Sequence, residues 1–262
     1  MRSIAIMNQK GGVGKTTSTV NISAALAAAG KRVCVVDLDS QAHTTLHLGV
    51  NLGCDAKSLY DVLTDKCKIA DVRRAVGENL WLIPAHPDMV GAEFALASAV
   101  GRELILRDEL LEDNFSVDYL FIDCPPSLGL FTMNALTAAQ DVFVPLLPQA
   151  LPLEGFMSLV ESMEAITKRV NRSLRLSGIF FNQFDGTRLA DEVLQDVISF
   201  FEQRDKLPTF CRDTVVFKTK IRRNIRLAEA PSHGCPIFEY DPSSSGAEDY
   251  RKLAEEIVEK FR

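Results

Sequence analysis

The glycine-rich segment Lys10-Gly11-Gly12-Val13-Gly14-Lys15-Thr16-Thr17 constrains the fold of this chain more than any other stretch. It lies between an apolar run at residues 4–7, typical of a buried strand, and a helical pattern that begins near Val20. Glycines in a strand–turn–helix let successive backbone N–H groups converge on phosphate oxygens above the positive end of the helix dipole. Lys15 can then reach the β- and γ-phosphates, and Thr16 can offer its hydroxyl to Mg²⁺. The segment predicts a nucleotide phosphate site.

A second lysine, Lys10, stands at the front of this loop, and Gln9 occupies the place where the pattern G-x-x-x-x-G-K-[ST] would begin with glycine. The string K-G-G-V-G-K-T-T resembles the deviant Walker A loop of the ParA/MinD family of ATPases, and residues 8–17 are most similar to the ParA/Soj branch. The resemblance implies that Lys10 reaches across a nucleotide-sandwich dimer to the partner's phosphates and that residues 10–17 bind ATP. A solvated loop lysine is the alternative for Lys10.

Composition limits the class of protein. The 262 residues are 47% hydrophobic and 24% charged, as in an ordinary globular protein with a full core. The formal net charge of −6 argues against a surface coated in positive charge for nucleic acid, but it leaves room for a local basic face. The six cysteines form no C-x-x-C pair, so we expect neither a zinc site nor a disulfide framework. The expected compartment is the cytoplasm.

Short apolar runs alternate with helical patterns along the chain, which is typical of parallel strands joined by crossover helices. Strands are predicted at residues 4–7, 33–36, 80–84, 119–123, 142–145 and 176–181. Helices are predicted near 59–63, across 87–111 with a break near Gly101, at 153–170, at 189–201, and at the end of the chain. We expect one α/β domain over residues 1–262, doubly wound, with a mostly parallel sheet of about seven or eight strands flanked by helices.

Acidic residues follow two of the predicted strands. Asp37 and Asp39 come after residues 33–36, and Asp123 ends residues 119–123, so all three are expected where open α/β sheets bind ligands. In the ParA resemblance Asp39 orients the attacking water and belongs to the metal site, with Asp37 toward the magnesium side. Asp123 is similar to a Walker B aspartate, a ligand of Mg²⁺ directly or through water. The alternative is that Asp37 and Asp39 only cap a loop.

The residues around these carboxylates are similar to the family's two switch segments. Residues 124–129, C-P-P-S-L-G, resemble switch II, whose two prolines stiffen the turn. Switch I usually reads D-x-D-P-Q-G-N, and here Ser40, Ala42 and His43 replace its proline, glycine and asparagine, which predicts a less rigid backbone. His43 and His47 are expected to be solvated loop residues.

A basic segment, K-T-K-I-R-R-N-I-R, begins at Lys218 of this acidic protein. Charge alone favours a solvated basic loop, but such a cluster also suits phosphate backbones bound without sequence preference. Residues 221–234 resemble the family's I-P-R-N-V-R-L-x-E-A-P-S-x-G, which implies DNA binding by Arg223 and contact of Asn224 with the nucleotide base. Arg222 replaces the proline, which should add charge and loosen a loop expected to frame adenine. The residues assigned to DNA are Arg188, Lys218, Lys220, Arg222, Arg223 and Arg226, and Arg222 is also assigned to the nucleotide.

The resemblance covers nearly the whole chain and implies a weak Mg²⁺-dependent ATPase that forms a homodimer with ATP, binds DNA non-specifically and releases it on hydrolysis. Lys10, Lys15 and Asp39 are the expected catalytic residues, and Thr16, Asp39 and Asp123 are the expected metal site. Segregation of a plasmid or chromosome with a ParB-like partner, and a nucleoid location with ATP, are expected. The alternatives are a positioning ATPase for a protein cargo and a MinD-like membrane-cycling regulator. MinD-like relatives carry an amphipathic helix beyond this point, so no stable membrane association is expected.

Overall fold

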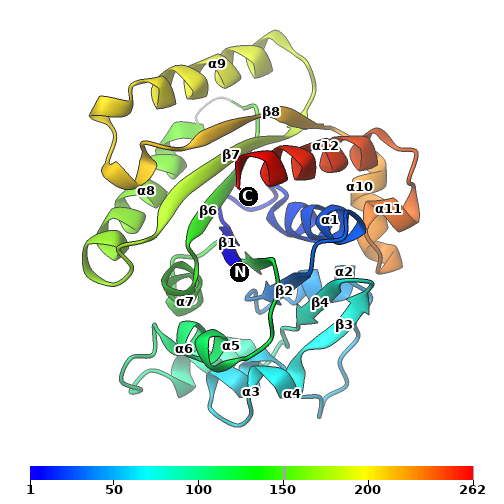
Figure 1. Ribbon diagram of the computed structural model, residues 1–262, viewed down its shortest axis with the longest axis vertical. Coiled ribbons are helices and arrows are strands. Elements are labelled where there is room, and N and C mark those ends of the chain that lie inside the picture. The colour runs from blue at the N-terminus through cyan, green and yellow to red at the C-terminus, as the bar shows by residue number, and fades with distance from the viewer. Residues whose placement is uncertain (150–151, 262) are drawn as a thin grey trace.

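A computed structural model describes residues 1–149 and 152–261, in which one eight-stranded sheet has the order β3-β4-β2-β5-β1-β6-β7-β8 (Figure 1). The β3–β4 pair is antiparallel and the other pairs are parallel. The strands are β1 (Arg2–Ile6), β2 (Val33–Asp37), β3 (Arg74–Gly77), β4 (Leu80–Ile83), β5 (Tyr119–Asp123), β6 (Asp141–Leu146), β7 (Arg175–Phe184) and β8 (Val215–Arg222). The predicted fold class, a mostly parallel sheet flanked by helices, is confirmed.

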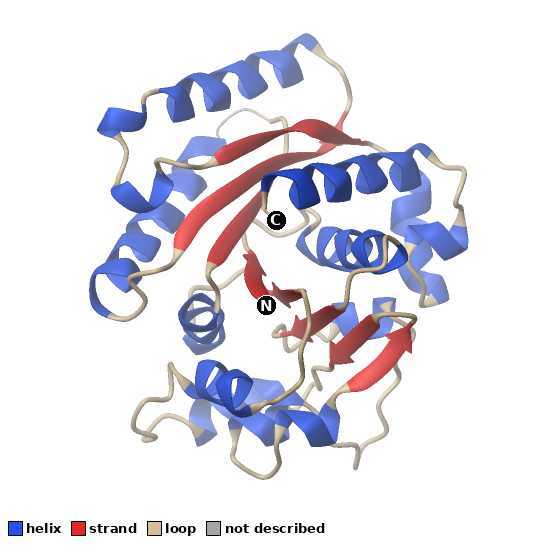
Figure 2. Ribbon diagram, in the orientation of Figure 1, coloured by secondary structure: helices blue, strands red, loops and turns tan. Residues whose placement is uncertain are grey.

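Helices cover both faces of the sheet (Figure 2). The α-helices are α1 (Lys15–Ala28), α2 (His43–His47), α3 (Leu59–Leu63), α4 (Ile69–Val72), α5 (Met89–Ala95), α6 (Ile105–Glu112), α7 (Leu130–Ala138), α8 (Pro152–Arg169), α9 (Arg188–Glu202), α10 (Ile225–Glu229), α11 (Ile237–Tyr240) and α12 (Ser245–Lys260). Short 3₁₀ helices are η1 (Arg204–Lys206), η2 (Thr209–Cys211) and η3 (Ala230–His233). Of the helices in the described chain, none is both long and apolar enough to cross a membrane.

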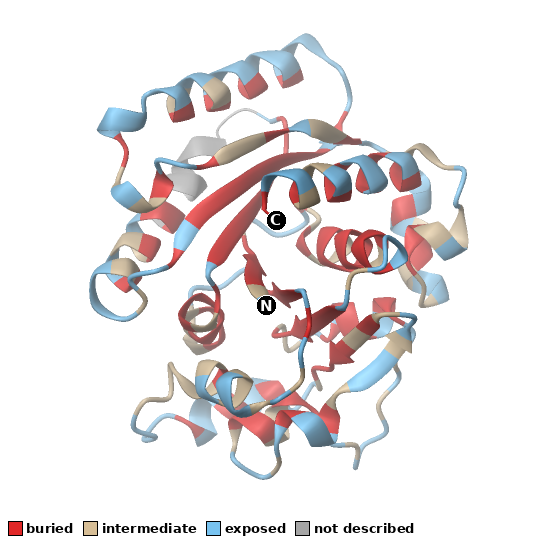
Figure 3. Ribbon diagram, in the orientation of Figure 1, coloured by how far each residue is buried: buried red, intermediate tan, exposed pale blue. Residues whose placement is uncertain are grey.

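The sheet separates two hydrophobic cores. Successive residues of a strand face opposite sides, so Ile4 and Ile6 of β1 enter the core beneath α1 and α12, while Ala5 enters the core beneath α3 and α7. The central strands are buried throughout, and the outward sides of α9 and α12 are exposed (Figure 3). This two-sided burial explains why the central strands read as continuous apolar runs in the sequence.

The strand order brings the carboxyl ends of β1, β5 and β2 side by side. Asp37, the last residue of β2, is the register partner of Asp123, the last residue of β5, and Asp123 in turn pairs with Ile6 of β1. The glycine-rich loop leaves β1 at the same edge and leads directly into α1. The strand order reverses at β1, because its parallel neighbours β5 and β6 lie on opposite sides, so this edge is a switch point of the kind where open α/β sheets bind ligands.

Most predicted elements are present, and Gly101 (φ 70°) lies in the predicted break, here between α5 and α6. Strand β8 was not predicted: charge alone favoured a basic loop from residue 218, whereas Lys218 and Lys220 belong to this strand. The strand alternates buried Phe217 and Ile221 with polar residues, a period-2 pattern. Strand β3 was also missed, because its short, largely exposed sequence R-A-V-G has few strand-forming residues.

Strand β8 ends the sheet, and α12 supplies hydrogen-bond acceptors to its free edge. The Glu256 carboxylate accepts bonds from the backbone N–H of Lys218 (3.0 Å) and of Thr219 (2.9 Å), and from the Thr219 hydroxyl (2.7 Å). About two turns earlier on α12, Asp249 accepts from the backbone N–H of Arg222 at 2.9 Å. The carboxylates therefore satisfy edge amides that would otherwise be open to another strand.

We predict that Glu256→Ala lowers the free energy of unfolding by about 1–3 kcal/mol, because two edge amides and a hydroxyl lose a charged acceptor. Urea unfolding followed by circular dichroism measures the loss. Glu259→Ala, at an exposed position of the same helix, is the matched control and should change the free energy by less than about 0.5 kcal/mol. Equal values for the two variants would contradict this role for Glu256.

Candidate functional site

The loop between β1 and α1 has the backbone that its glycines predict. Gly12 and Gly14 have φ angles of 72° and 85°, in the left-handed region, and Gly14 is the residue that precedes the first turn of α1. A Cβ at Gly14 would lie 2.6 Å from Nδ2 of Asn182, whereas a Cβ at Gly11 or Gly12 would meet only open space. The loop is therefore an open cradle, which fits a phosphate group held by backbone amides.

The two lysines of the loop point in different directions. Lys15 is 8% exposed, and its Nζ donates to the backbone oxygen of Lys10 at 3.3 Å. This hydrogen bond connects the two ends of the glycine-rich loop on its buried side. Burial lowers the pKa of Lys15, although the nearby Asp123 carboxylate opposes the shift. Lys10 is exposed at the rim, where its Nζ donates to Oε1 of Gln149 at 2.8 Å. One ammonium group thus lies within the cradle and the other faces outward.

Two buried carboxylates lie beneath the loop, and hydroxyl groups hold both. Oδ2 of Asp123 accepts from Thr16 Oγ1 and from Thr44 Oγ1, each at 2.7 Å. Oδ2 of Asp37 accepts from Thr45 Oγ1 at 2.7 Å and from the Thr45 backbone N–H at 2.8 Å. Burial, and then repulsion from Asp123, raises the pKa of Asp37 to about 7, and burial also raises the pKa of Asp123. Thr44 and Thr45, which come shortly after the acidic end of β2, were not predicted as site residues from the sequence.

This donor set fits magnesium. Lys15 is a cation close to Asp123, but among the described residues no cation contributes to the pKa shift of Asp37, and a divalent ion would reduce the repulsion between the two carboxylates. Asp39, half-buried in the loop after β2, accepts from the Gln41 backbone N–H at 3.0 Å and lines the space above. Within the part of the chain that the structure describes, no three His, Cys, Asp or Glu side chains form an all-protein cage. That agrees with Mg²⁺, which usually takes one or two protein oxygens plus phosphates and water.

Above these groups is a cleft of about 670 Å³. It is lined by four segments far apart in the sequence, which are the glycine-rich loop, the residues after β2, the turn after β5, and the end of β7. Its lining residues are Gly11, Gly12, Gly14, Lys15, Thr16, Thr17, Asp39, Ser40, Gln41, His43, Pro125, Pro126, Ser127 and Gln183. Predicted site residues thus meet at one place, and its volume is within the usual range for small-ligand sites.

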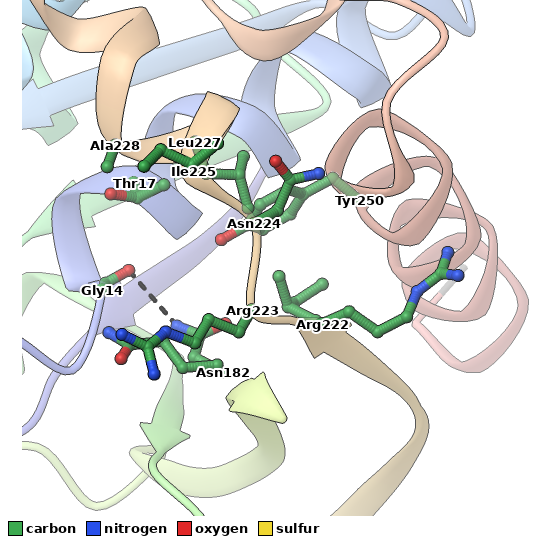
Figure 4. Close-up of a pocket in the computed structure, with 12 residues that line it drawn as sticks. Gly14, Thr17, Asn182, Arg222, Arg223, Asn224, Ile225, Leu227, Ala228 and Tyr250 are labelled. Atoms are coloured by element: carbon green, nitrogen blue, oxygen red, sulfur yellow. Dashed lines mark hydrogen bonds between the residues drawn. The ribbon is translucent and has the colours of Figure 1, made fainter. Parts of the chain in front are cut away.

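A second hollow of about 340 Å³ adjoins the cleft, sharing Gly14, Thr17 and Gln183 with it (Figure 4). The Nδ2 of Asn182 donates to the backbone oxygen of Val13 at 2.8 Å and to Ser18 Oγ at 3.0 Å, so this side chain supports the glycine-rich loop. Its Oδ1 is buried without a hydrogen-bond partner among the described residues.

The far wall of this hollow contains Asn224, which the resemblance assigned to the nucleotide base, and Arg222, which replaces the family's proline and was also assigned to the nucleotide. The Asn224 side chain caps α10 by accepting from the Arg226 backbone N–H (2.8 Å) and donates to Ser245 Oγ (2.8 Å). The Arg222 guanidinium donates to Asp249 and to Glu248, each at 2.7 Å. The predicted loosening at Arg222 is not seen, because these ion pairs join the end of β8 to α12.

The residues predicted for DNA binding do not form one uniform surface. Lys218, Lys220 and Arg222 alternate along β8 and line a shallow groove that α12 shares with its carboxylates. In-chain ion pairs engage Arg188 with Glu192 (2.9 Å), Lys220 with Asp191 (3.8 Å), Arg222 with Asp249 (2.7 Å), and Arg226 with Glu229 (2.8 Å). Lys218 and Arg223 are exposed and have no ion pair with another described residue. Arg223 lies at the second hollow, on the side of Gly14 and Asn182 (Figure 4).

The expectation for His47 was wrong. The residues after Ala42 form helix α2, and His47 is buried in it (1% exposed) while His43 is exposed. The sequence carried no start signal for this helix, because Ala42 precedes it in a left-handed conformation without a side-chain cap. Burial lowers the pKa of His47 from 6.5 to about 4, against a smaller opposing effect of the Cys235 backbone.

We predict that His47 makes the protein less stable in mild acid. The unfolded chain takes up a proton near pH 6.5 and the folded chain only near pH 4, so stability falls as the pH drops through that window. Between pH 7 and 5 this contribution is about 2 kcal/mol. Urea unfolding at both pH values should show a smaller change for His47→Leu than for the wild type. His43→Leu, at the exposed start of the helix, should keep the wild-type change, and a wild-type change in His47→Leu would refute the prediction.

Comparison with known proteins places this geometry in a family. A family model described as an AAA domain matches residues 1–176. The chain is 44% identical over 257 residues to the sporulation initiation inhibitor protein Soj of Bacillus subtilis, covering 97% of each chain. It is 42% identical over 259 residues to the chromosome-partitioning ATPase Soj of Treponema pallidum, covering 98% of this chain and 97% of that one.

Solved structures of nucleotide-bound proteins are also similar to this chain in fold and sequence. Cobyrinic acid a,c-diamide synthase from Mycobacterium smegmatis, with bound ATP analog and magnesium, has a TM-score of 0.82 and 33% identity, covering 98% of this chain and 94% of that chain. The septum site-determining protein MinD from Pyrococcus horikoshii, complexed with Mg-ADP, has a TM-score of 0.74 and 26% identity, covering 98% and 95%. On these matches and on its glycine-rich loop, buried carboxylates and sheet order, this chain belongs to the ParA/Soj family of chromosome-partitioning ATPases.

Proposed function

We propose that this chain hydrolyses ATP with Mg²⁺, dimerises when ATP is bound, and in that form binds DNA without sequence preference until hydrolysis releases it. The observation that carries the proposal is the cluster of Lys15, Thr16 and Asp123 at the floor of a cleft whose walls include Asp39. Its use would be segregation of a chromosome or plasmid with a ParB-like partner, which the names of the partitioning relatives support.

The residues at the cleft suit a triphosphate and its metal ion. The open glycine loop and α1 would hold phosphate oxygens, Lys15 would contact the terminal phosphates, and Thr16 with Asp123 would hold Mg²⁺. Bound Mg²⁺ would neutralise charge that develops on the phosphate oxygens. The solved relatives bind the same groups, since one contains an ATP analog with magnesium and another contains Mg-ADP.

Asp39 is the residue proposed to orient the attacking water. Its side chain is half-buried, borders the cleft, and is held by the Gln41 backbone N–H. A carboxylate in this place can accept a proton or a hydrogen bond from water directed at the terminal phosphate. Lys15 would stabilise the charge of the transferring group from the opposite side, where burial excludes water from its ammonium.

The second hollow would hold the base and ribose. Asn182 has an unused buried acceptor, Oδ1, and a base with an exocyclic amine could supply the missing donor. Leu227 and the Tyr250 ring provide apolar surface, and the Tyr250 hydroxyl is already bonded to Ser18 at 3.0 Å. An amine-bearing base such as adenine would therefore satisfy a polar atom that the protein leaves unpaired.

Dimerisation and DNA binding involve residues at the rim. Lys10 is exposed beside the cleft and is not used within its own cradle, as a residue that serves a second copy would require. Arg223 is exposed at the adjoining hollow, so a nucleotide bound there could shift the position of Arg223, a cation that is available to DNA phosphates.

The direct test of the whole proposal is to measure DNA binding without nucleotide, with ADP and with ATP. Binding that does not depend on ATP would refute it.

We predict that Lys10→Ala still binds ATP but no longer forms ATP-dependent dimers. The variant keeps Lys15 and the loop amides, which bind the phosphates of its own site, but it lacks the Lys10 ammonium group that is proposed to contact the phosphates of the second copy. Light scattering with a non-hydrolysable ATP analogue and Mg²⁺ gives the mass, and fluorescence titration gives the affinity. Lys57→Ala removes an exposed lysine outside the cleft and should dimerise normally. A Lys10→Ala variant that dimerises like wild type would leave Lys10 as an ordinary loop residue.

We predict that Arg223→Glu weakens DNA binding about tenfold or more while ATP-dependent dimers still form. The salt dependence of log K should also become shallower, because fewer phosphate counterions are released on binding. Fluorescence anisotropy with a random-sequence duplex at several salt concentrations provides both values. Arg172→Glu, a charge reversal at another exposed arginine, controls for the general change in net charge. Equal losses in the two variants would show only an effect of net charge.

A further inference from the structure

Helix α2 places two consecutive buried threonines on two different carboxylates. Thr44 donates to Asp123 at 2.7 Å, and Thr45 donates to Asp37 at 2.7 Å. Thr44 is 0% exposed and Thr45 1% exposed. The helix follows directly on the loop that carries Asp39. It therefore fixes the end of that loop to the floor of the site through side chains.

The Asp123 carboxylate receives hydroxyl donors from two separate elements. Thr16 at the start of α1 and Thr44 on α2 both donate to Oδ2 at 2.7 Å, while Thr19 approaches Oδ1 at 3.3 Å. Without Thr44, these hydroxyl donors to Asp123 would all come from α1, and only the weaker contact of Thr19 would complement Thr16. Donors from two helices set the direction of Oδ2, and the Thr16 oxygen retains lone pairs for a metal ion while its proton points at Asp123.

The Thr44 hydroxyl differs from an ordinary buried threonine hydroxyl. Threonines inside helices commonly donate to a backbone carbonyl of the preceding turn, as Thr19 does to Lys15 at 3.0 Å. The buried Thr214, far from the cleft, likewise donates to the backbone oxygens of Leu176 and Cys211, each at 2.7 Å. Thr44 instead bonds a carboxylate 79 positions away in the sequence. Thr214 is thus a matched example of a hydroxyl with only a structural role.

We propose that Thr44 is a positioning residue of the magnesium site. It orients Asp123 for the ion and fixes the end of the Asp39 loop to that same carboxylate, so that metal binding and the position of Asp39 are coupled. The inference rests on the proposed function, in which Thr16 and Asp123 hold Mg²⁺. It adds a residue to the metal site that touches neither the nucleotide nor the ion.

The test is the Mg²⁺ dependence of nucleotide binding. Metal-free protein with a fluorescent ATP analogue is titrated with Mg²⁺, and the half-saturating concentration is measured for the wild type, Thr44→Val, Thr44→Ala and Thr44→Ser. Loss of the hydroxyl in the Val and Ala variants should raise that concentration about 10–100-fold, the usual range for partners of metal ligands. Affinity for the analogue without Mg²⁺ should stay within about twofold, and Thr44→Ser should restore the wild-type value.

Matched controls separate this role from folding. Thr214→Val should lower the melting temperature but leave the Mg²⁺ requirement unchanged. The Ser and Ala variants differ only in the hydroxyl, so they decide the question even if Thr44→Val does not fold. An Ala variant with the Mg²⁺ requirement of wild type, or of the Ser variant, would overturn the proposal for Thr44. Wild-type binding that does not respond to Mg²⁺ would instead overturn the proposed site and this inference together.

Discussion

The rest of the structure depends on two carboxylates, Asp37 and Asp123, buried side by side at the ends of neighbouring strands. Like charges in a medium of low polarity repel strongly, and burial alone disfavours each ionised form. Hydroxyls from Thr16, Thr44 and Thr45 offset part of this cost, but they carry no charge. A cation would offset the remaining repulsion between the two carboxylates. The electrostatics of this carboxylate pair therefore favour a metal ion.

The same constraint explains the role of helix α2. Its threonines hold both carboxylates, and its far end packs against the segment after α10, where Gly49 and Gly234 approach so closely that a Cβ on Gly49 would lie 2.8 Å from the Gly234 oxygen. His47 fills the space between these segments as a neutral ring. One short helix therefore joins the carboxylate pair to the part of the chain that begins with Asn224. The pieces are coupled by packing and not by a flexible linker.

Sequence patterns predicted the parts of this fold in which one physical requirement dominates. Central strands are buried on both faces, so they read as apolar runs, and the phosphate loop needs glycine at positions such as Gly12 and Gly14. Prediction failed where contacts with residues far away in the sequence determine the local structure. Strand β8 was not predicted because its charged residues favoured a loop, although carboxylates of α12 bind its polar side chains, and His47 is covered in part by residues almost 190 positions later. The contacts of Thr44 could not be foreseen, since they require the register of β2 and β5.

The pairing of the basic residues bears on how DNA binding could be controlled. Most of the assigned cations are matched by carboxylates of this acidic chain, and Lys218 and Arg223 are the exposed ones without an ion pair among the described residues. Affinity for DNA depends exponentially on the number of phosphates neutralised, so a monomer with few available cations binds weakly at physiological salt. In the proposed function, two copies on one duplex would double that number and would gain from effective concentration. In the proposed function, a sparse basic surface is thus what makes DNA binding sensitive to ATP, because a strongly basic monomer would hold DNA in every nucleotide state.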